Sequence, residues 1–436
     1  MEDRLMYRKI TVFLEEWKIS KHRKPLILQG ARQVGKTYSI LEFGRTHYEN
    51  VAYFNFETNP KLNKIFEENI SPAYLIPLLS HTAGQTIVRE KTLIIFDEVQ
   101  LCERALTSLK YFCEDAPDYH IIVAGSLLGV AVNRAKYSFP VGKVDMKTMY
   151  PMDMEEFMTA QGEDVLVKQI KTCFQTDTPL PSVLHDAAMQ LYRQYLIVGG
   201  MPECVMQFAQ TKDYILVRHI QETLLASYLN DMSKYNNLNE IKKTRLTYDN
   251  ITVQLSKKNT RFQYKLLKKG GRASEFENAI EWLCLSGIVS QVYRVEQIRK
   301  PLENYRDIDA FKIYVSDLGL LCAKKNLTAN DILYMAEEIS DFKGGMAENY
   351  VHVQLTINGY ASYYWESGRS AEIDFIIQHG GRLIPIEVKS ADNTKAKSLK
   401  LYMETYKPAY AIKLSAKNFS FENGIKTVPL YAAFCI

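Results

Sequence analysis

A glycine-rich segment near the N-terminus has the residues needed to bind the phosphates of a nucleotide. Residues 30–37 read GARQVGKT, the pattern G-x-x-x-x-G-K-T. The glycines let backbone amides wrap around phosphate oxygens, and a following helix adds the partial positive charge of its N-terminus. Lys36 can reach the β- and γ-phosphates, and the Thr37 hydroxyl can ligate Mg²⁺. The pattern predicts ATP and Mg²⁺ as cofactors, bound by a loop of Gly30, Ala31, Arg32, Gln33, Val34, Gly35, Lys36 and Thr37.

An acidic pair follows an apolar run further along the chain. Residues 93–96 read LIIF, and Asp97 and Glu98 come directly after them. A buried strand delivers such residues to its carboxyl end, where parallel α/β sheets bind ligands. We expect Asp97 to hold the Mg²⁺ through water and Glu98 to polarise the attacking water as a general base. A strand that ends in a solvated acidic turn is the alternative.

Two more residues are candidates for the same site. Ser126 follows the apolar run at 121–124 and can sense the γ-phosphate or its water, or it can be an ordinary turn serine. Arg134 can serve the nucleotide of an adjacent subunit as an arginine finger, which would require a homo-oligomer, or it can be a surface arginine. The predicted catalytic set is Lys36, Asp97, Glu98, Ser126 and Arg134.

A second group of chemically active residues lies near the C-terminus. Two apolar segments, AEIDFII and LIPIEVK, are separated by a turn that contains His-Gly-Gly. Side chains alternate along a strand, so Glu387 and Lys389 share a face, with Asp374 on the adjacent strand. Glu348, on a preceding helix, adds a carboxylate. Such oxygen clusters suit a hard divalent cation that activates water, with Lys389 neutralising developing charge. An ordinary charged hairpin is the alternative.

The positive charge of the chain is concentrated in its middle. Residues 236–272 contain ten basic residues and two acidic ones, a net charge of +8, whereas the whole chain carries +4. Clustered lysines and arginines supply most non-specific affinity for nucleic acid. The segment predicts DNA as a partner, and a basic surface that docks on acidic parts of the same chain is the alternative. The candidate DNA-binding residues are Lys257, Lys258, Arg261, Lys265, Lys268, Lys269 and Arg272.

Four short apolar runs must position the N-terminal site. They begin at residues 26, 51, 93 and 121 and alternate with helical stretches, which indicates a parallel sheet buried on both faces. The region that follows is mostly helical, the basic stretch ends in two strands, and the last hundred residues are mixed. We predict an α/β protein with four domains. These are an ATPase domain at 1–150, a helical lid at 151–235, a winged-helix-like module at 236–325 and a nuclease-like domain at 326–436.

Several segments carry a resemblance to a known family. LILQGARQVGKT, LIIFDEVQ and VAGSLLGV, with YLIVGGMPECV and FKIYVSDLGLL further on, resemble the AAA-superfamily ATPases of the archaeal and bacterial type. In that family a P-loop ATPase is fused to a conserved C-terminal region of unknown function. The resemblance covers nearly the whole chain. It implies an additional-strand NTPase core, binding of ATP and Mg²⁺, hydrolysis and a winged-helix-like segment.

The C-terminal group resembles a second superfamily. The order of Glu348, Asp374 and the Glu387-x-Lys389 pair along helix, strands, helix and strand is similar to the PD-(D/E)xK nucleases. The resemblance implies a restriction-endonuclease-like fold and a second divalent metal. The chain departs from the pattern at one point, because Ile373 rather than proline precedes Asp374. Domains of this kind also persist as inactive binding modules.

Composition excludes several classes of protein. The apolar fraction of 47% and charged fraction of 24% over 436 residues are ordinary for a globular protein. Seven cysteines without a CxxC pair argue against a disulfide framework or a zinc ribbon. No apolar stretch approaches the length of a membrane helix, and the first residues, MEDRLMYRK, do not resemble a signal peptide. We expect a cytoplasmic protein.

Two functions follow from these observations. The first is a Mg²⁺-dependent ATPase whose nucleotide state controls DNA engagement, with metal-dependent DNA cleavage as an added activity. The second is an ATP-dependent switch or scaffold that binds a protein partner and contains an inactive nuclease-like domain.

Overall fold

The computed structural model describes residues 7–125, 139–234, 237–256, 261–334, 340–368, 371–390 and 397–436. The chain divides into two compact units. The first comprises residues 1–150 and 285–287, and the second comprises residues 151–284 and 288–436.

A parallel sheet forms the centre of the first unit. Within the described residues its order is β2-β3-β4-β1-β5, and every neighbouring pair is parallel. All residues of β3 and β4 are buried, as their continuous apolar sequences require. Because β4 lies between β1 and β3, the sheet has the additional strand that the resemblance implies. The strands are β1 (Leu26–Gln29), β2 (Asn50–Asn55), β3 (Thr92–Asp97), β4 (His120–Gly125) and β5 (Asp145–Thr148).

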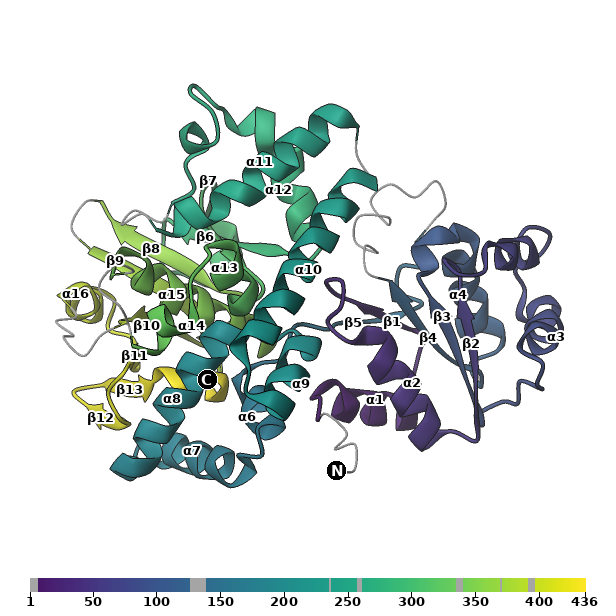
Figure 1. Cartoon of the computed structure of the whole chain (residues 1–436), viewed down its shortest axis with the longest axis horizontal. Coiled ribbons are helices and arrows are strands. Elements are labelled where there is room, and N and C mark those ends of the chain that lie inside the picture. Colours follow the sequence, from purple (N-terminus) through teal and green to yellow (C-terminus); the bar gives the residue numbers. More distant parts are fainter. Residues whose placement is uncertain are drawn as a thin grey trace. The chain divides into compact units, whose positions relative to one another are not determined.

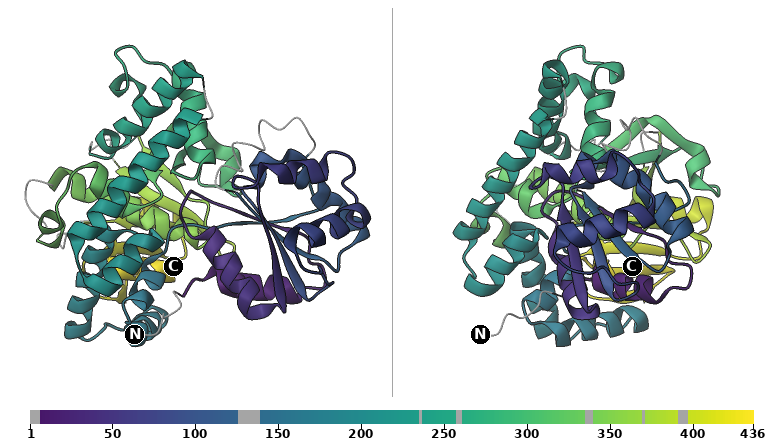
Figure 2. Two further views of the ribbon diagram at one scale, coloured as in Figure 1. Left: turned by 45° about the vertical axis from the view of Figure 1, so that its right-hand side comes forward. Right: turned by 90° about the vertical axis from the view of Figure 1, so that its right-hand side faces the viewer.

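Helices cover this sheet on both faces (Figures 1 and 2). Alternate residues of β3 point to opposite faces. Ile94 and Phe96 join a core with Leu75 of α3 and Leu109 of α4. On the other face α2 packs against the sheet, where Gly44 leaves room for the side chain of Val51. The helices are α1 (Ile10–Ile19), α2 (Lys36–His47), α3 (Pro72–Ala83) and α4 (Glu103–Asp115), with short 3₁₀ turns η1 (Pro60–Phe66) and η2 (Val99–Leu101).

The second unit begins with a group of helices. Asp153 starts α6 through a capping box with Glu156. Helices α8, α9 and α10 pack against one another (Figure 1). These helices are α6 (Met154–Ala160), α7 (Asp164–Thr176), α8 (Ser182–Val198), α9 (Pro202–Thr211), α10 (Tyr214–Lys234), α11 (Leu238–Leu255) and α12 (Ala273–Leu285). The later ones are α13 (Leu318–Lys324), α14 (Ala329–Leu333), α15 (Ser340–Ile357) and α16 (Lys397–Tyr406), and η3 (Tyr264–Leu266), η4 (Leu302–Tyr305) and η6 (Leu430–Cys435) are 3₁₀ turns.

A mixed sheet completes the second unit. Among the described residues it has the order β12-β13-β11-β10-β9-β8-β6-β7. β9 and β10 form an antiparallel hairpin, and β10 pairs with β11 in parallel. The strands are β6 (Val289–Val295), β7 (Arg306–Val315), β8 (Tyr363–Ser367), β9 (Ala371–His379), β10 (Arg382–Val388), β11 (Ala411–Ser415), β12 (Ser420–Glu422) and β13 (Ile425–Pro429).

The α/β fold with a P-loop-type parallel sheet is confirmed, together with a separate mixed sheet in the C-terminal part. The hairpin β6–β7, predicted as part of a winged-helix-like module, belongs to the same sheet as the C-terminal strands, because β6 pairs with β8. The division into four domains stays a prediction. No helix in the described part of the chain has both the length and the apolar character needed to cross a membrane.

Candidate functional site

The loop between β1 and α2 has a backbone that requires its glycines. Gly30 and Gly35 have φ values of 148° and 90°, and Gln33 between them has 63°. A Cβ atom on Gly30 would lie 2.1 Å from the backbone oxygen of Met149, which excludes any larger residue. Helix α2 begins at Lys36, so the loop runs directly into a helix N-terminus. The loop is therefore built in the order that phosphate binding needs.

Lys36 is folded back onto this loop. Its Nζ donates to the backbone oxygens of Gly30, at 2.9 Å, and Ala31, at 2.7 Å. Burial lowers the pKa of Lys36 to about 8, and the negative charges of Glu98 and Asp97 oppose that shift. A buried ammonium needs acceptors, and here the loop carbonyls provide them. The phosphates of a nucleotide would offer the same ammonium charged acceptors, which bind it more strongly.

Asp97 is the point at which α2, β2 and β3 meet. Thr37 Oγ1 donates to Asp97 Oδ2 at 2.9 Å, and the Tyr53 hydroxyl donates to the same oxygen at 2.7 Å. Asn55 Nδ2 is 3.1 Å from the Tyr53 oxygen and 3.5 Å from Asp97 Oδ2. The hydroxyl of Thr37 and the carboxylate of Asp97 are hard oxygen donors side by side. This donor set fits Mg²⁺.

Glu98 is presented by an unusual backbone. Its φ of 51° is in the left-handed region, which residues with a side chain adopt infrequently and which is enriched at functional sites. The Gln100 side-chain amide donates to Glu98 Oε2, and the Glu98 N–H donates to Asp97 Oδ1 at 3.0 Å. Glu98 is thus oriented beside Asp97, at the carboxyl end of β3.

Sequence reasoning did not find Tyr53 and Asn55. Asn55 lies directly opposite Asp97 in the register of β2 and β3. The alternation of Tyr53 and Asn55 with apolar neighbours at the end of a predicted strand was the available signal. Ser126 and Arg134 lie outside the described residues, and their roles stay predictions.

The structure brings the residues of the nuclease-like group together, and the contacts of Asp374, Glu387 and Lys389 are local to the β9–β10 hairpin. Val388 N–H donates to Asp374 Oδ2 at 2.7 Å, and Lys389 Nζ forms an ion pair with Glu387 Oε1. Glu387 is 3% exposed, and its other oxygen, Oε2, is buried without a hydrogen-bond partner. A buried carboxylate oxygen of this kind needs a proton or a cation.

Glu348 is close enough for its charge to act on Asp374 and Glu387, and its Oε2 accepts hydrogen bonds from β7. The Tyr314 hydroxyl donates to Glu348 Oε2 at 3.0 Å, and Lys312 Nζ donates to the same oxygen at 3.3 Å. Lys312 also forms an ion pair of 2.5 Å with Glu372 Oε1. Lys312 was not predicted, because a lysine within the strand AFKIYV indicates an exposed position on a different module. The β7 strand instead lies against α15.

The charges of this group are closely coupled. Burial, together with the negative charges of Glu348 and Glu387, raises the pKa of Asp374 well above its usual range. Burial also raises the pKa of Glu387, while Lys389 opposes the shift. In the described ranges, no group of three or more histidine, cysteine, aspartate or glutamate side chains is arranged to hold a metal ion.

Some of the predicted DNA-binding residues already bind other groups of the protein, and others are exposed to solvent. Lys268 pairs with Glu275 at 2.8 Å, and an Arg261 nitrogen donates to the Asp309 backbone oxygen at 3.2 Å. Lys265 is exposed in η3, and Lys269 and Arg272 are exposed between η3 and α12. Lys257 and Lys258 lie outside the described residues.

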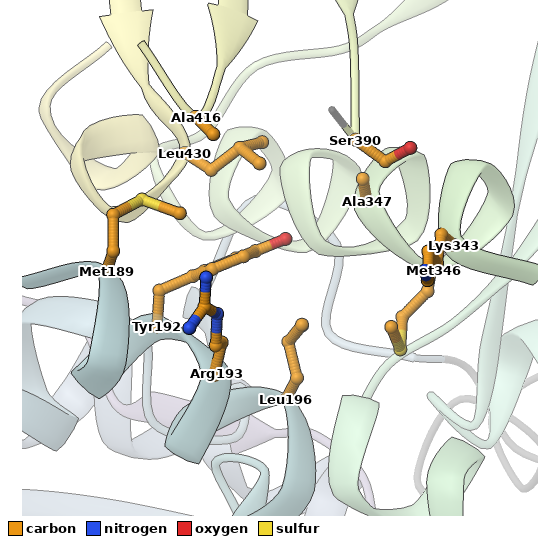
Figure 3. A pocket seen from close by; sticks show the side chains of 10 residues that line it. All are labelled: Met189, Tyr192, Arg193, Leu196, Lys343, Met346, Ala347, Ser390, Ala416 and Leu430. Carbon is orange, nitrogen blue, oxygen red and sulfur yellow. The ribbon is translucent and has the colours of Figure 1, made fainter. Parts of the chain in front are cut away.

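A cavity of about 180 Å³ lies in the second unit. Figure 3 shows Tyr192 and Arg193 of α8 on one side of it, and Lys343 and Ala347 of α15 on another, with Ser390. Arg193 Nε is buried without a hydrogen-bond partner. Ala347 and Ser390 are next to Glu348 and Lys389 in the sequence, so the cavity adjoins two segments of the nuclease-like group.

The comparison with sequence families supports the nature of the first site. Residues 22–158 match the family described as AAA domain. The chain therefore carries an AAA-type P-loop ATPase domain. Residues 189–331 and 343–433 match two families described as domains of unknown function, DUF8612 and DUF4143. No curated protein matches the chain in sequence.

Solved structures show more distant similarity. The Walker-type ATPase PABY2304 of Pyrococcus abyssi is 14% identical, with a TM-score of 0.45 over 74% of this chain and 97% of that one. The ORC1 protein of Aeropyrum pernix, in a complex with DNA, is 10% identical, with a TM-score of 0.30 over 73% and 91%. The ORC2 protein of the same organism is 12% identical, with a TM-score of 0.33 over 75% and 92%.

Proposed function

We propose that this protein is a Mg²⁺-dependent ATPase whose nucleotide state controls its engagement of DNA. The contact between Thr37 Oγ1 and Asp97 Oδ2, 2.9 Å long, carries the first part of the proposal. It joins the glycine-rich loop to the acidic end of β3, so that a hydroxyl and a carboxylate that can share a Mg²⁺ ion lie side by side. Glu98, beside Asp97, completes the set.

Each residue has a role in hydrolysis. The backbone amides of residues 30–37 bind the phosphates, and Lys36 exchanges its loop carbonyls for β- and γ-phosphate oxygens. Thr37 and Asp97 would hold Mg²⁺, which when bound neutralises the negative charge that develops on the phosphates. Glu98 orients the attacking water and accepts its proton. Gln100 keeps the Glu98 carboxylate in position.

ATP turnover by a Glu98→Gln variant tests this assignment. Gln keeps the shape and the hydrogen bonding of the side chain but cannot accept a proton. We expect kcat to fall by about 10²–10⁴-fold. The Kd for ATP, measured by calorimetry, should stay within a few-fold of the wild-type value, because Glu98 does not contribute to the phosphate loop.

Glu67→Gln is the matched control. Glu67 is exposed at the end of η1, and the same chemical change there should leave both constants unaltered. A Glu98→Gln protein that hydrolyses ATP at the wild-type rate would show that another residue activates the water.

The turn before α12 supports the DNA-binding part of the proposal. Lys265, Lys269 and Arg272 are exposed close together in the sequence. The exposed positions of α12 include Glu277 and Glu281, whose charge would repel phosphates in a DNA groove. We therefore assign the contact to the turn, on the phosphate backbone, and not to base reading by the helix.

A second activity, metal-dependent DNA cleavage, is favoured by the buried Glu387 Oε2 that has no partner. A divalent cation between Asp374 and Glu387 would satisfy that oxygen, and when bound it would supply an activated water. Lys389 is positioned to neutralise charge on a phosphate.

The alternative function is an ATP-dependent switch or scaffold that binds a protein partner, with an inactive nuclease-like domain. In either case we propose a cytoplasmic location, since all seven cysteines are free. We also propose a homo-oligomer, because an arginine finger at Arg134 would act on the nucleotide of an adjacent subunit. No other residue supports this part of the proposal.

A further inference from the structure

Lys312 is a buried lysine among acidic residues, and the proposed functions do not use it. Its side chain is 1% exposed. Its Nζ lies 3.3 Å from Glu348 Oε2, 2.5 Å from Glu372 Oε1 and 5.1 Å from the centre of the Tyr364 ring. An ammonium is buried only when its charge is compensated, and here two carboxylates and an aromatic face compensate it.

We propose that Lys312 is a built-in cation of the nuclease-like group, which removes Glu348 from the metal ligands and limits the group to one divalent ion, held by Asp374 and Glu387. The proposal rests on the metal-dependent centre proposed above, and it adds a residue from β7 to that centre. It also states how many metal ions the centre takes.

The hydrogen bonds of Glu348 support this assignment. Both Lys312 and Tyr314, two positions apart on β7, direct donors to Glu348 Oε2. An oxygen that already accepts from an ammonium and a hydroxyl is a poor ligand for a second cation, because like charges repel. Glu387 Oε2, in contrast, has no hydrogen-bond partner and is available.

The balance of carboxylates and lysines in the nuclease-like group also supports a single divalent ion. The carboxylates of Glu348, Glu372, Asp374 and Glu387 form the acidic side of the group, and Lys312 and Lys389 form the basic side. With Lys312 in place, two negative charges remain for a metal ion to neutralise, which matches one divalent cation. Without Lys312 the uncompensated charge would increase and a second cation would become favourable.

Mn²⁺ binding to the full chain tests the proposal without relying on cleavage. All proteins carry Thr37→Ala, which removes the hydroxyl ligand of the nucleotide site, and no nucleotide is added. Free Mn²⁺ is measured by electron paramagnetic resonance. We expect one bound Mn²⁺ in the parent protein, no binding after Asp374→Asn, and weaker binding of one Mn²⁺ after Glu348→Gln, which removes a negative charge but no ligand.

Lys312→Met is the decisive variant, because methionine fills a similar volume without charge. We expect a second Mn²⁺ or at least ten-fold tighter binding, whereas Lys312→Arg, which keeps the cation, should bind as the parent does. If Lys312→Met does not fold, the comparison of Glu348→Gln with Asp374→Asn still decides. Equal loss of Mn²⁺ in those two variants would overturn the proposal.

The outcomes also separate this proposal from the metal-dependent centre on which it rests. If the parent binds no Mn²⁺ but Lys312→Met does, Lys312 excludes metal altogether, which contradicts the centre with one ion as well as the metal-dependent site on which it rests. If neither protein binds Mn²⁺, both proposals fail. If Lys312→Met binds Mn²⁺ as the parent does, only the role of Lys312 fails.

Discussion

His120 is a histidine kept neutral inside the first unit. Its Nδ1 lies 2.7 Å from the Tyr48 hydroxyl, and the Trp17 ring packs edge-on at 6.0 Å. Burial, together with the positive charges of Arg23 and Lys18, lowers its pKa from 6.5 to about 4. In the unfolded chain the imidazole would titrate near its ordinary value. Protonation at mildly acidic pH therefore favours the unfolded chain.

This shift predicts a pH-dependent stability. The contribution of neutral His120 is complete above about pH 6.5 and is lost as the pH falls toward 4, because the unfolded chain binds the extra proton. We expect the melting temperature of the first unit to fall between pH 7 and pH 5, with a free-energy slope of up to about 1.4 kcal/mol per pH unit from this residue. Calorimetry across that range measures the slope.

His120→Gln should flatten the profile, whereas His81→Gln, at an exposed histidine, should not. An unchanged slope in His120→Gln would contradict the assignment. His352, buried in the second unit with a pKa lowered to about 3, contributes to the transition of that unit and should be unaffected.

At the scale of elements, two of the segments that resemble the AAA-superfamily ATPases, YLIVGGMPECV and FKIYVSDLGLL, contact each other in the second unit. Their contacts stabilise the packing of helices. Asp317 accepts from the Leu320 N–H at 2.8 Å, which caps α13, and from the Gly200 N–H at 2.6 Å. A Cβ on Gly200 would lie 2.0 Å from the Met152 oxygen, and one on Gly319 would lie 2.4 Å from the Val198 oxygen. Gly319 thus allows α13 to approach the end of α8, and Gly200 allows the turn between α8 and α9 to approach the segment before α6.

Loss of this link should destabilise the second unit. Asp317→Ala leaves at least two buried N–H groups without acceptors, at a cost of about 1–3 kcal/mol each. We expect the free energy of unfolding of that unit to fall by about 2 kcal/mol or more in urea titration.

Asp249→Ala is the control for this variant. Asp249 forms an exposed ion pair with Lys324, and such pairs contribute at most about 1 kcal/mol. If the two variants unfold at the same urea concentration, the Asp317 carboxylate is not the link described.

At the scale of the whole molecule, the charge distribution defines how DNA would bind. The +8 of residues 236–272 is partly offset by acidic neighbours outside the segment, such as Glu275, which pairs with Lys268. The exposed turn before α12 keeps its charge. Phosphate contacts release counterions, so the affinity for DNA should fall steeply with salt. We expect a triple alanine variant to bind more weakly and to lower the salt slope by about 2–3. The three positions are Lys265, Lys269 and Arg272.

The matched control removes three exposed lysines elsewhere and should leave the slope unchanged. Those lysines are Lys61, Lys110 and Lys168. Repeating the titration with a non-hydrolysable ATP analogue tests nucleotide control, since DNA and nucleotide must alter each other's affinity by the same factor. Equal DNA affinity with and without the analogue would contradict nucleotide control. An unchanged salt slope in the triple alanine variant would show that DNA contacts residues outside the turn.

The local features of the nucleotide site were predictable from the sequence. Residues 30–37 are contiguous, their glycines specify the backbone of the loop, and the strands on either side have continuous apolar runs. A motif of neighbouring residues carries its own geometry, so the α/β class and the P-loop followed without a structure. The strand pair that carries Asp374 and Glu387 was equally local, because a short turn joins its strands.

Contacts between distant segments required the tertiary structure. Lys312 meets Glu348 and Glu372 only because β6 pairs with β8 and brings β7 into the C-terminal sheet. Tyr53 reaches Asp97 only through the pairing of β2 with β3. The sequence by itself determined which residues could bind phosphate or metal, because residue type and close spacing are local properties. Strand order decided which of their charges are already neutralised, because pairing between strands does not depend on separation along the chain.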